Sequence, residues 1–249
     1  MRKILKTGQN QVDVLVLFGG TIVEGLNVLA KAIENQTAKT TIIVGGAGHT
    51  TDALRKTFAD RFEDDPAFTF EVLKGLSEAE IFQKALAKRY GLQADFLETR
   101  SSNCGNNITF LLDLLKEKNT PCKSIVLCQD GTMQHRMQAT LEKEAPEIKI
   151  YNFATYQAHV HPNPDSQGGF SLDTHPEGMW TVERYVELLC GEISRLKDDE
   201  NGYGPNGKNY IAHVDIPETV EQAFKTLQDS NLFTVRRAQT QFKDPFEAV

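Results

Sequence analysis

Short apolar runs of strand length alternate with stretches of helical periodicity along most of the chain, and this alternation constrains the fold more than any other feature. Five runs are predicted to be strands, with DFLE (95–98) as a weaker sixth candidate: VDVLVLF (12–18), TTIIV (40–44), FTFEV (68–72), SIVLC (124–128) and KIYNF (149–153). The first, second and fourth runs are nearly continuous and rich in β-branched residues, which is typical of strands buried on both faces. Strand–helix–strand repetition predicts right-handed crossovers, and therefore an α/β fold with a doubly wound, mainly parallel sheet.

Helical spacing of apolar residues fills the intervals between these runs. The clearest stripes are Val23, Leu26, Leu29, Ala30 and Ile33, then Leu54, Phe58 and Phe62, then Ile81, Phe82, Ala85 and Leu86. Ser77 and Glu80 have the spacing of a capping box and mark the start of the third helix. Thr21 and Glu24 offer a second capping box after the first strand.

The C-terminal third of the chain changes character at His159. Residues 159–170 (HVHPNPDSQGGF) are rich in Pro, Gly and polar residues and are predicted to form a long loop or lid. Helices are predicted over 180–196 and around 220–227. We therefore expect an α/β domain over residues 1–158 and a smaller, mostly helical C-terminal extension over residues 159–249.

Composition narrows the classes of partner. The net charge is −7 and no cluster of Lys and Arg stands out, which argues against nucleic acid and anionic membranes as partners. The four cysteines contain no C-x-x-C pair, so reduced thiols of a cytoplasmic protein are expected, without zinc. No apolar run approaches the roughly 20 residues of a membrane span, and the basic N-terminus lacks the apolar stretch of a signal peptide. A small-molecule ligand remains as the expected partner, and the oligomeric state stays open.

Small and polar residues follow the predicted strands, where an open parallel sheet normally binds its ligands. The candidate binding residues at these turns are Gly19, Gly20, Gly45, Gly46, His49, Ser102, Asn103, Asn107 and Gln129. Glycines let backbone N–H groups approach a ligand closely, and the start of a helix favours negative charge. Turn geometry and helix capping explain any one of these turns equally well. Four such turns around one edge of a sheet, however, favour a binding site.

Two carboxylates stand at the same predicted edge. Glu98 ends the weak sixth strand, and Asp130 follows the fourth strand. Both are candidates for acid/base catalysis or for orienting a ligand. Surface carboxylates are common in proteins, however, so the alternative that neither residue has a catalytic role stays open.

Several well-known site motifs are missing from the sequence. GGAGHTT (45–51) lacks the G-K-[ST] ending of a P-loop, the first strand is not followed by G-x-G-x-x-G, and no G-x-S-x-G elbow occurs. His159 and His161 alternate as metal ligands on a strand can, but they lie among prolines in a predicted loop. We therefore expect no metal site.

Three segments carry a resemblance to a known family: SSNCGNN (101–107), CQDGTMQHRMQAT (128–140) and the long run from 178 to 217 that begins GMWTVERYVELLCGEISRLKDDENGYG. They closely resemble segments of YdcF-like proteins, within the bacterial family that also contains SanA and ElyC. The likeness extends from about residue 12 to about residue 217. It implies a Rossmann-like α/β domain with a smaller C-terminal part, and S-adenosyl-L-methionine as ligand, with no established reaction.

The resemblance also implies site residues. The E…S-x-N-T-x-E-N pattern of the family corresponds here to Glu98, Ser101, Asn103, Cys104, Asn106 and Asn107, the glutamate before the long helix corresponds to Glu78, and the arginine after the fourth strand to Arg136. Asn106 replaces a glutamate, and Met133 stands where the family often has histidine. These two departures suggest that chemistry performed by other branches is absent here.

The expected function is accordingly that of an S-adenosylmethionine-binding protein, which either uses this ligand in a reaction or only binds it. The acidic-x-G-x-G-x-G signature of common methyltransferases is absent after the first strand, so no motif supports methyl transfer. Two other functions stay open. One is a hydrolase or transferase acting on a phosphate-containing or glycan-type small molecule, with Arg136 supplying positive charge. The other is a non-catalytic small-molecule sensor.

Overall fold

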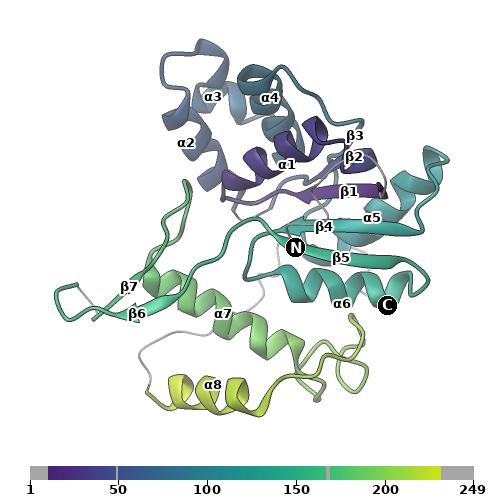
Figure 1. Ribbon diagram of the computed structural model, residues 1–249. Helices are drawn as coiled ribbons and strands as arrows, with labels where there is room; N and C mark the ends of the chain where they lie inside the picture. Colours follow the sequence, from purple (N-terminus) through teal and green to yellow (C-terminus); the bar gives the residue numbers. More distant parts are fainter. Residues whose placement is uncertain (1–10, 49, 167–168, 231–249) are drawn as a thin grey trace.

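A five-stranded parallel sheet forms the centre of the computed structural model, which describes residues 11–48, 50–166 and 169–230 (Figure 1). The strands lie in the order β3-β2-β1-β4-β5, as in Rossmann-like folds. They are β1 (Val12–Phe18), β2 (Ala38–Val44), β3 (Phe96–Glu98), β4 (Ser124–Gln129) and β5 (Lys149–Ala154). The chain first builds outward from β1 to β3 and then returns to the other side of β1, so the order reverses between β1 and β4.

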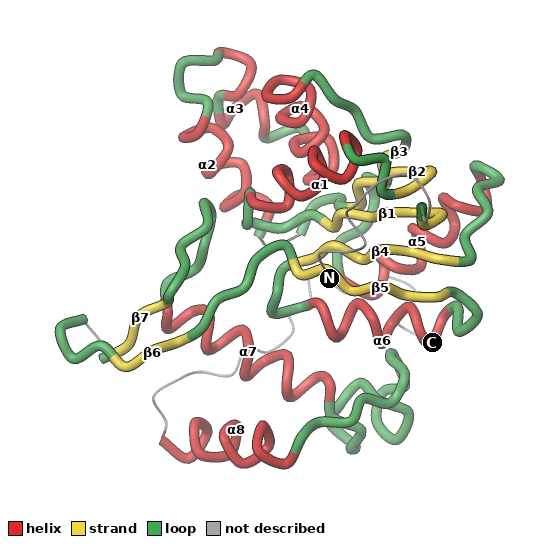
Figure 2. The backbone as a smooth tube through the Cα atoms, in the orientation of Figure 1, coloured by secondary structure: helices red, strands yellow, loops and turns green. Residues whose placement is uncertain are grey.

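Helices follow the strands and cover both faces of the sheet (Figure 2). They are α1 (Glu24–Glu34), α2 (Thr51–Arg61), η1 (Pro66–Phe68, a 3-10 turn), α3 (Phe70–Leu73), α4 (Glu78–Tyr90), α5 (Cys104–Glu117), α6 (Gln134–Glu144), α7 (Val182–Leu196) and α8 (Glu218–Ser230). No helix in the described part of the chain is both long and apolar enough to cross a membrane.

The sequence of β1 is apolar almost without interruption because helices cover both faces of this strand. Leu15 and Leu17 pack into the cluster formed with α1, α2 and α4 on one face. Val14 and Val16 pack into the cluster formed with α5 and α6 on the other face. Alternate side chains of a strand point to opposite faces, so a strand covered on both sides needs apolar residues at consecutive positions.

Most of the sequence predictions about the sheet are confirmed, including the weak strand at 95–98, which is β3, and the capping box of Ser77 and Glu80. The prediction of a strand over 68–72 is wrong: this segment forms η1 and the short helix α3. The side chain of Asp65 accepts a hydrogen bond from the Ala67 N–H and that of Thr69 accepts one from the Val72 N–H, so two caps compete successfully with an extended conformation. The alternation of this segment reflects one buried residue, Phe68, rather than one face of a strand.

The predicted capping box of Thr21 and Glu24 is also wrong. Helix α1 begins after Val23, which makes no side-chain capping bond. The hydroxyl of Thr21 is instead buried without a hydrogen-bond partner among the described residues.

The C-terminal part contains an unexpected antiparallel hairpin, β6 (Val160–Pro162) with β7 (Phe170–Leu172), where the sequence predicted only a loop or lid. Figure 1 shows this hairpin projecting away from the five-stranded sheet. Helices α7 and α8 share an apolar cluster of their own, which includes Val186, Cys190 and Phe224.

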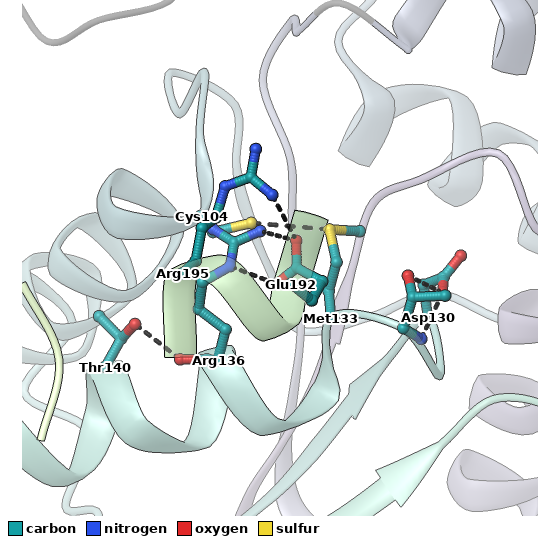
Figure 3. A network of polar contacts seen from close by, with 8 residues as sticks. Cys104, Asp130, Met133, Arg136, Thr140, Glu192 and Arg195 are labelled. Carbon is teal, nitrogen blue, oxygen red and sulfur yellow. Dashed lines mark hydrogen bonds and ion pairs between the residues drawn. The ribbon is translucent and has the colours of Figure 1, made fainter. Parts of the chain in front are cut away.

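Helix α7 is joined to α6 by a bidentate ion pair between Arg136 and Glu192, with Nε–Oε2 and Nη2–Oε1 distances of 2.5 and 2.7 Å. Arg195 approaches the same carboxylate from α7, with its Nη1 3.4 Å from Oε1 (Figure 3). The Arg136 and Glu192 side chains are only 13% and 7% exposed. Breaking one partner of so buried a pair leaves an uncompensated charge.

We expect Glu192→Gln to lower the free energy of unfolding by about 3–5 kcal/mol, because Arg136 would remain buried without its counter-charge. Glu187→Gln on the same helix is the matched control. Its partner Arg184 has a side chain that is 36% exposed, so its loss should cost about 0.5 kcal/mol or less. Urea unfolding of both variants measures the difference. Equal effects would contradict the role assigned to the Arg136–Glu192 pair.

Candidate functional site

The candidate site lies at the carboxyl edge of the sheet, where β1 and β4 are neighbours. Strand order reverses between these two strands, and the crevice at such a point is where open α/β sheets bind ligands. Gly19 and Gly20 follow β1, Gln129 is the last residue of β4, and Asp130 follows it. The structure therefore brings these four predicted residues to one place.

Glu78 enters this edge from an element that the strand pattern alone does not connect to it. It is the first residue of α4, and its backbone N–H donates to the carbonyl of Gly46 at 2.8 Å. Its carboxyl group is almost fully buried and accepts a hydrogen bond from the Thr51 hydroxyl at 2.8 Å. Burial raises the pKa of the Glu78 carboxyl above its ordinary value, although the Thr51 bond and the charge of Arg55 act in the opposite direction.

The glycines after β1 and β2 make room for groups of the protein itself. A Cβ atom on Gly19 would lie 2.4 Å from Glu78 Oε2, and one on Gly45 would lie 3.0 Å from the Glu78 Cβ. A Cβ atom on Gly46 would lie 2.1 Å from the Ser101 carbonyl oxygen. Close approach explains these three glycines, as the sequence suggested, but the close neighbour in each case is another part of the chain.

The polar run that leads into α5 mostly stabilises its own turn. Asn103 caps the helix through its side-chain oxygen, which accepts from the Asn106 N–H at 3.0 Å. The Ser101 hydroxyl accepts from the Gly46 N–H at 3.1 Å, and that of Ser102 donates to the Asn106 side chain at 3.2 Å. Asn107 lies half-buried in the first turn of the helix. This run therefore joins the β3 end to the β2 end.

The carboxylate of Glu98 belongs to the same turn. It is buried and accepts the backbone N–H groups of Arg100 and Ser101 at 2.6 and 3.3 Å. These bonds engage both of its oxygens within three residues of the chain. The geometry of Glu98 is that of a carboxylate that shapes a turn.

Asp130, by contrast, uses one oxygen for all its bonds. Its Oδ1 accepts from the Thr132 N–H, the Thr132 hydroxyl and the Tyr156 hydroxyl, each at 2.8 Å. Burial and the neighbouring Asp130 charge raise the pKa of Tyr156, so the Tyr156 hydroxyl remains a donor. Within the described part of the chain Oδ2 has no hydrogen-bond partner. Asp130 is therefore held in place with one oxygen left for another group.

Gln129 presents a buried donor at the same point. Its Oε1 accepts the Asp130 N–H at 2.7 Å, which fixes the orientation of the amide because a flipped amide would set two donors against each other. Its Nε2 is then buried without an acceptor among the described residues, as is the hydroxyl of Thr21 across the strand-order reversal. Such atoms are rare in proteins, because each costs about 1–3 kcal/mol when left unpaired.

The segment 173–181 covers this end of β1. The Glu177 carbonyl accepts the Val23 N–H at 3.0 Å, and the Glu177 carboxylate pairs with Arg61 on α2. Gly178 has a φ of +81°, and a Cβ atom there would lie 2.0 Å from the Thr21 carbonyl oxygen. Trp180, at the end of the segment, also has a buried ring nitrogen without a partner in the described residues. This segment therefore packs directly on the residues that follow β1.

The positive charge of Arg136 is neutralised by an ion pair and is not available to the β1–β4 junction. Its guanidinium group is bound to Glu192, and Figure 3 shows this pair beside Cys104, with Asp130 set apart beyond Met133. The Cys104 and Met133 sulfur atoms are 3.7 Å apart. Met133, which the sequence comparison marked as a departure from histidine, thus contacts Cys104 beside this pair.

The alternating pair His159 and His161 lies beside a carboxylate of the C-terminal part. His159 on the approach to β6 bonds through Nδ1 to Asp173 at 2.7 Å, with His161 3.9 Å from the same carboxylate. His49 lies outside the described residues. Within the described ranges, no three His, Cys, Asp or Glu side chains gather in a way that could hold a metal ion.

Several residues of the site were not predicted. Thr51, Thr132 and Tyr156 hold the carboxyl groups, Thr21 was assigned to a helix cap, and 173–181 was not assigned to the site at all. The sequence offered one usable signal, the position of Thr51 and Tyr156 just after predicted strands. The covering segment offered no such signal, since it is distant from β1 in the chain.

No protein-family model matches the sequence.

The raised pKa of Glu78 predicts a pH-dependent effect of Glu78→Gln. The folded state holds the Glu78 proton to a higher pH than the unfolded state, so the wild type loses stability as pH rises above 4.5 toward the folded pKa. The glutamine variant lacks this titration. Its melting temperature relative to wild type should therefore increase between pH 4 and pH 8.

Thermal melting over this pH range provides the measurement. Glu71→Gln, at an exposed position of α3, is the control and should follow the wild type at every pH. A difference between Glu78→Gln and wild type that stays constant with pH would contradict the assignment.

Proposed function

We propose that this chain is a YdcF-like protein that binds S-adenosyl-L-methionine at the carboxyl edge between β1 and β4. The observation that carries the proposal is the pair of buried, unpartnered polar atoms on the two sides of the strand-order reversal, Gln129 Nε2 and Thr21 Oγ1. A site that binds its ligand at this point needs donors that the protein does not already use. The resemblance of three sequence segments to YdcF-like proteins supports the choice of ligand.

The chemistry of the edge suits this ligand. The amide of Gln129 can donate to a carboxylate or hydroxyl oxygen, and the free oxygen of Asp130 can accept from a hydroxyl or ammonium group. S-adenosylmethionine offers all of these groups, together with a positively charged sulfonium. Two acidic side chains, Asp130 and Glu78, favour a cation over a phosphate at this place.

Binding requires the covering segment to move. Thr21 and Gln129 are shielded from water, and residues 173–181 lie over the β1 end. The Glu177–Arg61 ion pair joins this segment to α2, and each side chain of the pair is partly exposed. We propose that segment 173–181 lifts to admit the ligand and closes again over it.

The proposed function is ligand binding, and no reaction is assigned to it. Asp130 is the better placed of the two predicted catalytic carboxylates, since both oxygens of Glu98 are occupied by backbone N–H groups. The alternative of a hydrolase or transferase acting on phosphates receives less support, because the buried Arg136 is neutralised by Glu192.

Calorimetric titration tests the proposal, with S-adenosylmethionine as ligand and S-adenosylhomocysteine, adenosine and ATP as comparators. Binding at 100 times the dissociation constant should stabilise the fold by about 2.7 kcal/mol, which a melting experiment checks independently. Binding of ATP without S-adenosylmethionine would overturn the proposal in favour of a phosphate ligand.

A matched pair of threonine variants locates the site. Thr21 and Thr37 both have buried hydroxyls without partners in the described residues, but Thr37 lies just before β2, at the opposite edge of the sheet. Replacing either by Val removes an unpaired hydroxyl at similar shape, so neither variant should lose stability.

We expect Thr21→Val to weaken S-adenosylmethionine binding about 5- to 10-fold, since a net hydrogen bond contributes about 1 kcal/mol. Thr37→Val should bind like the wild type. Titration calorimetry compares the two variants. Equal affinities would place the ligand away from the β1 end.

A further inference from the structure

Two glycines pack against the side chain of Glu78, where a larger residue would collide with it. Glycine is needed at position 19 because any Cβ atom there would meet Glu78 Oε2 at 2.4 Å, and a Cβ atom at position 45 would be 3.0 Å from the Glu78 Cβ. The adjacent strands β1 and β2 are therefore each followed by a residue without a side chain at the place where Glu78 packs. The Glu78 carboxyl group is therefore shielded from solvent and lies against the turn that follows β1.

The charge of Glu78 is poorly compensated by the protein. Among the described residues, its one hydrogen bond from a side chain comes from the neutral hydroxyl of Thr51, which itself accepts the Gly48 N–H at 2.7 Å. Arg55 is the charged group that acts on it from the described residues, and it does so without an ion pair. The Arg55 guanidinium is bound to Asp52 and to the carbonyl groups of Leu73 and Leu76.

A second unsatisfied group lies on the other side of the same turn. Gly19 is beside the Glu78 carboxyl, and the next residue, Gly20, is beside Gln129, whose Oε1 is 3.9 Å from the position of a Cβ atom. The Gln129 side chain is only 2% exposed, and its Nε2 has no acceptor among the described residues. The Gly19–Gly20 turn thus separates an uncompensated acid from an uncompensated donor. A ligand carrying a cation and an anion close together complements both.

We propose that Glu78 recognises the sulfonium charge of the ligand, so that the site prefers S-adenosylmethionine to S-adenosylhomocysteine, whose sulfur is neutral. This inference rests on the proposed function and adds the group that discriminates between the two ligands. The sulfonium group would lie on the Glu78 side of the Gly19–Gly20 turn, and the ligand carboxylate on the Gln129 side.

This arrangement predicts proton release on binding. Burial favours the protonated form of the Glu78 carboxyl in the free protein, whereas a cation beside it favours the carboxylate. Binding of the cation should therefore lower the pKa of the Glu78 carboxyl, and the fraction of Glu78 that is protonated in the free protein should release its proton to the buffer. Binding of a ligand without the sulfonium charge leaves more of that proton in place.

The test is titration calorimetry with S-adenosylmethionine and S-adenosylhomocysteine, at several pH values between 5 and 8, in buffers of different ionisation enthalpy. For the wild type we expect at least about tenfold tighter binding of the charged ligand, with proton release. In Glu78→Gln the ratio of the two affinities should fall close to one and the proton release should disappear.

Asp13→Asn serves as the control at the opposite end of β1. Hydrogen bonds from Lys39 and from the Lys123 N–H lower the pKa of Asp13 to about 2, so this carboxylate stays ionised over the whole range. The variant should keep both the affinity ratio and the proton release of the wild type.

The outcomes separate the two proposals. Equal binding of both ligands to the wild type, or S-adenosylmethionine binding without proton release, overturns the role of Glu78 and leaves the proposed function standing. An unchanged affinity ratio in a folded Glu78→Gln protein does the same. Failure of the wild type to bind S-adenosylmethionine overturns the proposed function and this inference with it. Should Glu78→Gln not fold, the wild-type affinity ratio and proton release still decide.

Discussion

Burial of β1 on both faces is the constraint on which the rest of the structure depends. The strand pairs with β2 on one side and β4 on the other, and helices cover it above and below. Chain continuity can satisfy this arrangement only by building one half of the sheet outward from β1 and then returning to its other side. The return creates the strand-order reversal at β1 and β4, and the candidate site follows from it.

Polar groups at the carboxyl edge fall into two kinds. The bonds of Glu98 and Asn103 are made within their own turn, and they hold the β3 end and the start of α5 in place. Thr21, Gln129 and Glu78 are buried with bonds or charge left uncompensated by the described residues. Unpaired buried groups cost stability, so their concentration around one glycine turn is the strongest structural sign of a binding site.

Local patterns predicted most of the fold and part of the site. The continuous apolar runs identified the central strands, and Ser77 and Glu80 identified the start of α4, since both signals act over a few neighbouring residues. The prediction for segment 68–72 was wrong because its residues alternate in the way that is typical of a strand. In the structure, side-chain caps at Asp65 and Thr69 stabilise short helices there. The reason for glycine at position 19 could not be predicted, because the group that needs the space, Glu78, approaches from a distant part of the chain.

The most direct test of the central claim is hydrogen–deuterium exchange with and without saturating S-adenosylmethionine. If the ligand binds between β1 and β4, amide protection should rise in residues 19–23, 129–134 and 173–181. It should stay unchanged in residues 35–39 and 120–124, at the opposite edge of the sheet. Protection confined to the opposite edge, or to α7 and α8 alone, would contradict the account.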